Sequence, residues 1–334
     1  MLSKKLSRQP LLFALCAGVA AWLSPLYVNP AISQEHKINI AYPGPTLISL
    51  PFLAANEWKL FAENGLSVQL IVMTFTISIP ALASEQVDYL GGVGPATVGS
   101  TLRGIPTRAV WFSSEKLLWS LMGQPSVKTL NDLKQKPIGI TGGLGATGHV
   151  ALLLALERAG TDSKGFNVIS FTSVSDLVQA LESGYLGAAM LQPPQLFYAR
   201  SKGFHEILDV ASTIRMPVGG LTTLAKIIKN RPGEVKAVIR SLQQAKQAMI
   251  KSKERSIDLV MKVTKTDREA AIRTYDMLKE VLAGNGIPNR AGIENIIKAL
   301  ALQGRIPDTN VPFDEIADTR LATEVAKELG YKAQ

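Results

Sequence analysis

Three glycines in one short stretch have the types and spacing needed to hold a phosphate or another anion. Gly143, Gly145 and Gly148 match the pattern G-x-G-x-x-G, which in dinucleotide-binding enzymes places a pyrophosphate against the start of a helix. A short apolar run (residues 138–141) precedes the glycines, and a helical pattern (residues 149–159) follows them. The stretch therefore predicts a strand, a glycine-rich turn and a helix whose free N–H groups attract negative charge.

Three interpretations of this turn are open: a ligand site in a cleft, a tight turn without a ligand, and an NAD site. The NAD site requires an acidic residue about 20 positions further on, at the end of the next strand. That region reads Phe171-Thr-Ser-Val and contains no carboxylate. A phosphate-binding loop would need Gly-Lys-Ser/Thr, which is not present. These observations disfavour a nucleotide cofactor, and we expect no cofactor.

The remaining reactive residue types do not form a catalytic or metal-binding pattern. The histidines are His36, His149 and His205, and their spacing does not match a metal site. His149 lies next to the glycine-rich turn, where it is either a ligand contact or a residue that starts the helix. Cys16 is the only cysteine. We therefore expect no metal, no catalytic residue and no disulfide, and a protein that is not an enzyme.

Three residues near position 113 allow more than one interpretation. Trp111 is either a core residue or an aromatic wall of a cleft. Glu115 and Lys116 are either surface or hinge charges, or contacts to a ligand.

The N-terminus has the pattern of a secretory signal peptide. Lys4, Lys5 and Arg8 precede an apolar run (residues 11–23), and a polar, proline-containing stretch follows that ends in Ala31-Ile-Ser33. The apolar run is shorter than the roughly 20 residues that span a bilayer. We expect cleavage after Ser33 and a periplasmic protein; an uncleaved anchor and a lipoprotein attached at Cys16 are the alternatives.

The charge of the chain is moderately positive, with 36 basic and 27 acidic residues and a net charge of +9. The basic residues are spread along predicted helices and do not alternate with aromatic residues, so the sequence does not predict nucleic-acid binding. A mildly positive field favours small anions.

Short apolar strands alternate with helices along the chain, which predicts an α/β fold with mostly parallel sheets flanked by helices. The pattern starts again after residue 124, and residues beyond 231 are mostly helical. We expect a signal peptide (residues 1–33), a first lobe (34–124 and 221–334) and a second lobe (125–220), with a ligand cleft between the lobes. Strands are expected at residues 37–42, 66–72, 87–91, 107–113, 138–141, 167–171, 186–191 and 207–210, and short helices at 80–84 and 126–133.

Several stretches resemble the periplasmic substrate-binding proteins of ABC importers, in particular the nitrate/sulfonate/taurine-type family. The run PFLAANEWKLFAENGLSV (51–68) is similar to the family's plylAkekGlFekeGLdV. Residues 81–88 (ALASEQVD), 129–140 (TLNDLKQKPIGI) and 181–190 (LESGYLGAAM) resemble aLasGeiDf, sikDLKGKkIgv and L.sGevDAa. The glycine-rich turn that the family has before its third helix is Thr74-Phe-Thr-Ile-Ser here.

The resemblance implies a two-lobed solute-binding component that closes on a small organic anion, such as a sulfonate, a carboxylate or a nitrate-like ion, and delivers it to a membrane permease. It implies a monomer whose partners are this solute and an ABC permease of the inner membrane. The alternative is an enzyme, either a nucleotide-dependent oxidoreductase or an enzyme like the thiamine-pyrimidine synthase that shares the fold. That synthase depends on a cysteine-rich motif, which the expected mature chain does not have. A sensory role with the same fold also remains open.

The expected site combines turns at the carboxyl ends of strands, where ligands bind in open α/β sheets. We expect one wall of the site to be formed by residues of the first lobe, Thr46, Gly94, Pro95 and Ser113. We expect the opposite wall to be formed by residues of the second lobe, Gly143, Thr147, Gly148 and Gln192.

Overall fold

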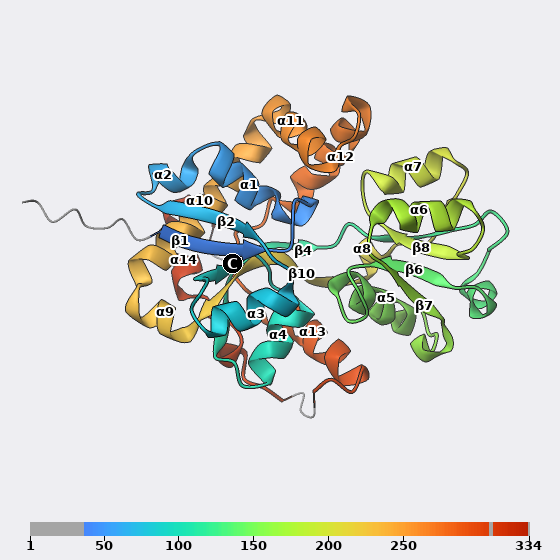
Figure 1. Cartoon of the computed structure of the whole chain (residues 1–334), viewed down its shortest axis with the longest axis horizontal. Helices are drawn as coiled ribbons and strands as arrows, with labels where there is room; N and C mark the ends of the chain where they lie inside the picture. Colours follow the sequence, from blue (N-terminus) through green and yellow to red (C-terminus); the bar gives the residue numbers. More distant parts are fainter. Residues whose placement is uncertain (1–36, 307–309, 333–334) are drawn as a thin grey trace, which may run out of the picture. The chain divides into compact units, whose positions relative to one another are not determined.

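Alternating strands and helices build two five-stranded sheets (Figure 1). The computed structural model describes residues 37–306 and 310–332. The expected signal peptide, with Cys16 and Ser33, lies outside the described residues. Residues His36–Gln334 group into one compact unit.

The first sheet has the strand order β2-β1-β3-β10-β4. Its strands are β1 (Lys37–Tyr42), β2 (Ser67–Val72), β3 (Tyr89–Leu90), β4 (Thr107–Lys116) and β10 (Arg215–Leu224). β1 runs parallel to β2 and β3, whereas β10 runs antiparallel to β3 and β4. Strands β1 to β4 therefore point the same way, and their carboxyl ends share one edge of the sheet.

The second sheet has the order β7-β6-β8-β5-β9. Its strands are β5 (Ser120–Gly123), β6 (Ile138–Thr141), β7 (Val168–Phe171), β8 (Ala188–Leu191) and β9 (His205–Leu208). β6 runs parallel to β7 and β8, and β5 runs antiparallel to β8 and β9. We refer to each sheet with its helices as the first and the second lobe. The expected mostly parallel α/β fold is confirmed.

Helices cover both lobes. In the first lobe they are α1 (Leu50–Glu57), α2 (Leu60–Glu63), α3 (Phe75–Ala83), α4 (Pro95–Leu102), α9 (Ala225–Asn230), α10 (Pro232–Lys251), α11 (Lys253–Thr264), α12 (Arg268–Val281), α13 (Arg290–Leu302) and α14 (Arg320–Glu328). In the second lobe they are α5 (Thr147–Arg158), α6 (Val174–Glu182), α7 (Gln195–Ser201) and α8 (Val210–Thr213). None of the described helices is long and apolar enough to cross a bilayer.

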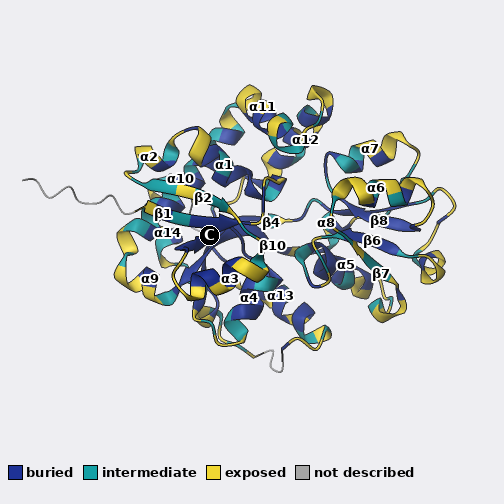
Figure 2. Cartoon of the chain, in the orientation of Figure 1, coloured by how far each residue is buried: buried dark blue, intermediate teal, exposed yellow. Residues whose placement is uncertain are grey.

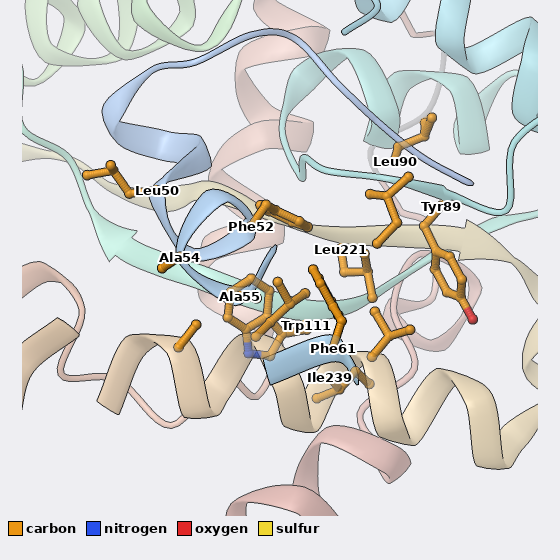
Figure 3. Close-up of a cluster of buried hydrophobic side chains, with 14 of the residues drawn as sticks. Leu50, Phe52, Ala54, Ala55, Phe61, Tyr89, Leu90, Trp111, Leu221 and Ile239 are labelled. Carbon is orange, nitrogen blue, oxygen red and sulfur yellow. The ribbon is translucent and has the colours of Figure 1, made fainter. Parts of the chain in front are cut away.

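The core of the first lobe lies on both faces of its sheet. Trp111 of β4 packs with Phe52 of α1, with ring centroids 6.1 Å apart in an edge-to-face arrangement (Figure 3). The next residue, Phe112, faces the opposite way and belongs to a second apolar cluster with Val98 of α4. Central strands such as β8 and β10 are buried over nearly their whole length (Figure 2). Burial on two faces explains why β8 is apolar at every position.

Local signals explain where some helices begin and end. Ser173 caps α6 by accepting a hydrogen bond from the Asp176 N–H at 3.0 Å, and Gly184, with φ +78°, follows the helix. For α12 the cap is Asp267, whose side chain accepts from the Ala270 N–H at 2.8 Å.

The structure differs from the sequence-based expectation in several elements. β10 was not expected as a strand, and it joins the first sheet although the expected boundary at residue 220 divides it. β5 pairs with β8 in the second sheet, although the expected boundary at residue 124 assigns it to the first lobe. Helix α3 begins five residues earlier than expected, with Pro80 inside it, and the helix expected at 126–133 is a 3-10 helix (Leu130–Gln135).

Candidate functional site

Strand ends of the first sheet place the first group of expected site residues. Thr46 follows β1, and its N–H donates to Ser49 Oγ at 2.9 Å, which closes a short 3-10 turn. Gly94 caps α4, and its N–H donates to Thr97 Oγ1 at 3.0 Å. Pro95 is the first residue of that helix, and Ser113 lies near the end of β4 with 3% of its surface exposed. These turns all lie at the carboxyl edge of the first sheet.

Strand ends of the second sheet place the other group. The turn between β6 and α5 carries Gly142, Gly143 and Gly145 with φ between +85° and +91°. These backbone conformations favour glycine. Helix α5 starts at Thr147, and Gln192 follows β8 directly.

The two groups meet at two places. A Cβ atom placed on Gly94 would lie 3.0 Å from Thr147 Oγ1, so the starts of α4 and α5 touch across the lobes. Ser113 and Gln192 line one small pocket; Gln192 follows β8 of the second lobe, whereas the other lining residues belong to the first lobe or to the β4–β5 connection. Thr46, Pro95, Gly143 and Gly148 are not among the residues that line this pocket. Gly148 instead packs near the Trp119 ring, and a Cβ on Gly143 would meet no atom within 4 Å.

The pocket that Ser113 and Gln192 share is small and mainly apolar, whereas a second pocket between the lobes, beside α7 and α12, has a volume of about 300 Å³. The volume of the shared pocket is about 20 Å³, which is room for a single water molecule. Its apolar lining consists of Leu47, Ile48, Leu118, Val218, Leu278, Val281 and Leu282. Its polar lining consists of Ser113, Ser114, Lys116 and Gln192. This pocket therefore has no room for a solute larger than a water molecule in the present arrangement of its lining.

The glycine-rich turn is held by groups of the protein itself. The Gly145 N–H donates to His149 Nδ1 at 2.8 Å, and only 9% of His149 is exposed. Burial, and to a smaller extent the charge of Arg305, lowers the pKa of His149 and keeps its imidazole neutral near pH 7. One N–H of the turn is thus already used within the protein.

Two arginines that the sequence did not indicate bridge the lobes. Arg305, which follows α13, donates from Nη2 to the Leu144 carbonyl at 3.1 Å, and a Cβ on Gly145 would overlap its guanidinium. Arg273 of α12 lies over the Phe197 ring of α7, 5.2 Å from the ring centre. Neither contact could be found from a local pattern, because each joins residues far apart in the chain.

Trp111, expected in the core or in the cleft wall, is completely buried in the core. Its Nε1 donates to Gln243 Oε1 at 2.9 Å. Lys246 Nζ lies 5.4 Å from the centre of the Trp111 ring and donates to the Gly284 carbonyl at 2.9 Å. Burial lowers the pKa of Lys246 to about 7, although the charge of Glu115 acts in the opposite direction. This buried cation lies outside the pocket between the lobes.

No group of three or more histidine, cysteine, aspartate or glutamate residues within 37–306 and 310–332 is arranged to hold a metal ion.

Comparisons with known proteins place this geometry in context. A family model described as NMT1/THI5 like matches residues 48–256. A protein of Brucella abortus that is described as a binding protein is 26% identical over 238 residues, which cover 64% of this chain and 67% of the relative.

Solved structures share the fold. The periplasmic nitrate-binding protein NrtA from Synechocystis PCC 6803 has a TM-score of 0.72 at 15% identity, covering 89% of this chain and 90% of that chain. The periplasmic aliphatic sulphonate binding protein SsuA from Escherichia coli has a TM-score of 0.70 at 16% identity, covering 86% and 99%. At such low identity these likenesses show the fold alone.

Proposed function

This chain belongs to the NMT1/THI5-like family, and on that premise we propose that it is the solute-binding component of an ABC-type import system. In this proposal the protein captures a small organic anion between its lobes and delivers it to a membrane permease. The protein acts in the periplasm as a monomer, after loss of residues 1–33, and carries out no catalysis.

The observation that carries the proposal is the pocket to which both lobes contribute. Ser113 comes from the first lobe and Gln192 from the second, and both line the same space. A solute that contacts both residues binds the closed form better than the open form, so its binding energy drives closure. The contact between Gly94 and Thr147 supports the same movement, because it brings the starts of α4 and α5 together.

The lining of the pocket supports an organic anion rather than a bare inorganic ion. Lys116 is the only cation among the described residues that line it, and Ser113 and Ser114 belong to the same lining, with Ser114 Oγ bonded to the Lys116 backbone. The rest of the lining is aliphatic, so an apolar part of the solute would be removed from water on closure. A sulfonate or carboxylate with a carbon skeleton satisfies both features, whereas nitrate would leave the aliphatic side chains without a partner.

The proposal is tested by thermal unfolding of the purified protein with a panel of sulfonates, carboxylates, nitrate and NADH. A solute at 100 times its dissociation constant stabilises the folded state by about 2.7 kcal/mol. We expect a shift with one organic anion, and a dissociation constant that rises in Gln192→Leu and Ser113→Ala. Ser183→Ala, an exposed serine of the second lobe, is the matched control and should leave binding unchanged. A shift with NADH alone would refute the proposal and restore the enzyme alternative.

A further inference from the structure

Phe75 lies directly against the backbone at the end of β3. It is the first residue of α3, and its side chain is half-buried. A Cβ placed on Gly92 would overlap Cζ of the Phe75 ring and lie 2.9 Å from Cε1. Position 92 therefore accepts only glycine while the ring stays in place, and the tip of the ring rests on the Gly92 backbone.

This contact lies at the edge of the first lobe that faces the second lobe. Phe75 follows β2 and Gly92 follows β3, and both strands end at the carboxyl edge of the sheet. Gly94, only two residues after Gly92, is in contact with Thr147 of the second lobe. Two residues span at most about 7 Å of chain. The Phe75 ring is thus close to the point where the lobes meet.

The Phe75 ring changes the chemical character of the first-lobe surface near the start of α4. The Gly92 backbone is covered by an aromatic side chain, and its carbonyl accepts a hydrogen bond from Thr222 Oγ1 at 2.8 Å. The Gly94 N–H is already bonded to Thr97 Oγ1. Val72 and Ile77, on either side of Phe75 in the sequence, are 60% and 61% exposed and add further apolar surface.

We propose that Phe75 is a specificity-determining residue that limits the size of the solute and selects solutes with an apolar group. The inference rests on the proposed function, because it concerns the same cleft. The anionic end of the solute binds the polar groups around Ser113, and its apolar end contacts the Phe75 ring. The length of the solute is then limited by the distance between these two parts of the cleft.

The test compares dissociation constants of the full-length protein and its variants for a series of straight-chain alkanesulfonates of increasing length, with nitrate as the smallest anion. In Phe75→Ala we expect the preferred chain length to increase, with the ratio of long-chain to short-chain affinity changing about tenfold or more. Phe75→Leu, which keeps an apolar side chain, should give an intermediate ratio and serves if the alanine variant folds poorly. Tyr185→Ala, an aromatic residue of the second lobe that is 60% exposed, is the matched control.

A second variant pair tests the contact itself. Gly92→Ala should displace the ring and alter the chain-length preference, and the effect should disappear when Phe75→Ala is added. An unchanged ratio across the series in Phe75→Ala and Phe75→Leu, with binding intact, would overturn the role of Phe75 alone. If the unaltered protein bound no member of the series, the proposed function would fail, and the assignment of Phe75 would fail with it.

Discussion

Replacing Lys246 by methionine should stabilise the protein at neutral pH. Lys246 is fully buried, and its ammonium donates one hydrogen bond, to the Gly284 carbonyl at 2.9 Å. Methionine has a similar length and no charge to bury. The carbonyl keeps a partner in the variant, because Gln243 Nε2 also donates to it at 3.0 Å. The substitution therefore removes the cost of a buried charge without leaving an unpaired acceptor.

The size of the effect depends on pH, and its sign follows from the lowered pKa. Burial lowers the pKa of Lys246 to about 7 in the folded protein, whereas an unfolded lysine has a pKa of about 10.4. Between these values the unfolded chain binds a proton that the folded chain does not, so stability rises with pH. The cost is absent above pH 10.4, grows by about 1.4 kcal/mol per pH unit as the pH falls, and is complete below pH 7.

Urea unfolding at pH 7, 8 and 9 measures this difference. We expect the stability of the unaltered protein to rise relative to that of Lys246→Met across this range, so that the two approach each other toward pH 10. The attraction between the ammonium and the Trp111 ring, worth about 1 kcal/mol, reduces the gain but does not reverse the slope. The matched control is Lys236→Met, because Lys236 hydrogen-bonds Glu324 and Glu328, which raise its pKa. Parallel stability curves for Lys246→Met and the unaltered protein would refute the reasoning.

Two further predictions concern the bridge between the lobes and a buried hydroxyl. Arg305→Ala removes the hydrogen bond to the Leu144 carbonyl, worth about 1 kcal/mol, and should shift the ligand-free protein toward an open form. Small-angle X-ray scattering should show a larger radius of gyration for this variant, with Arg320→Ala as the exposed control. An unchanged radius of gyration would contradict the role of Arg305 as a bridge between the lobes. Ser78→Ala should leave the free energy of unfolding unchanged or raise it by up to about 1 kcal/mol, because the buried Ser78 Oγ has no hydrogen-bond partner among the described residues. A clearly lower melting temperature in thermal unfolding would contradict this prediction and reveal a partner for the hydroxyl.

Much of the fold could be predicted because its strands are short, apolar and separated by helical patterns. β1 and β6 begin and end where the alternation indicates. β10 was missed because it contains Pro217, Gly219 and Gly220, residues that normally argue against a central strand. Its glycines are required by neighbours that are distant in the chain: a Cβ on Gly219 would lie 2.6 Å from Ile48, and one on Gly220 would lie 2.8 Å from Val93. No local pattern contains that information.

The candidate site, like the fold, could be predicted from the sequence only in part. Strand-end positions in the sequence indicated Ser113 and Gln192, and the structure places both in one pocket. The sequence also showed that the segment 74–78 departs from the family pattern, but not that the Phe75 ring lies against Gly92.

The sequence by itself determined the two α/β sheets and the family to which the chain belongs, because strand periodicity and turn residues are local properties. Only the tertiary structure decided which turns meet across the lobes, that Arg305 and Arg273 join them, and that Lys246 is buried beside Trp111. These contacts depend on how distant segments pack, and packing between segments is not encoded in the pattern of any one of them.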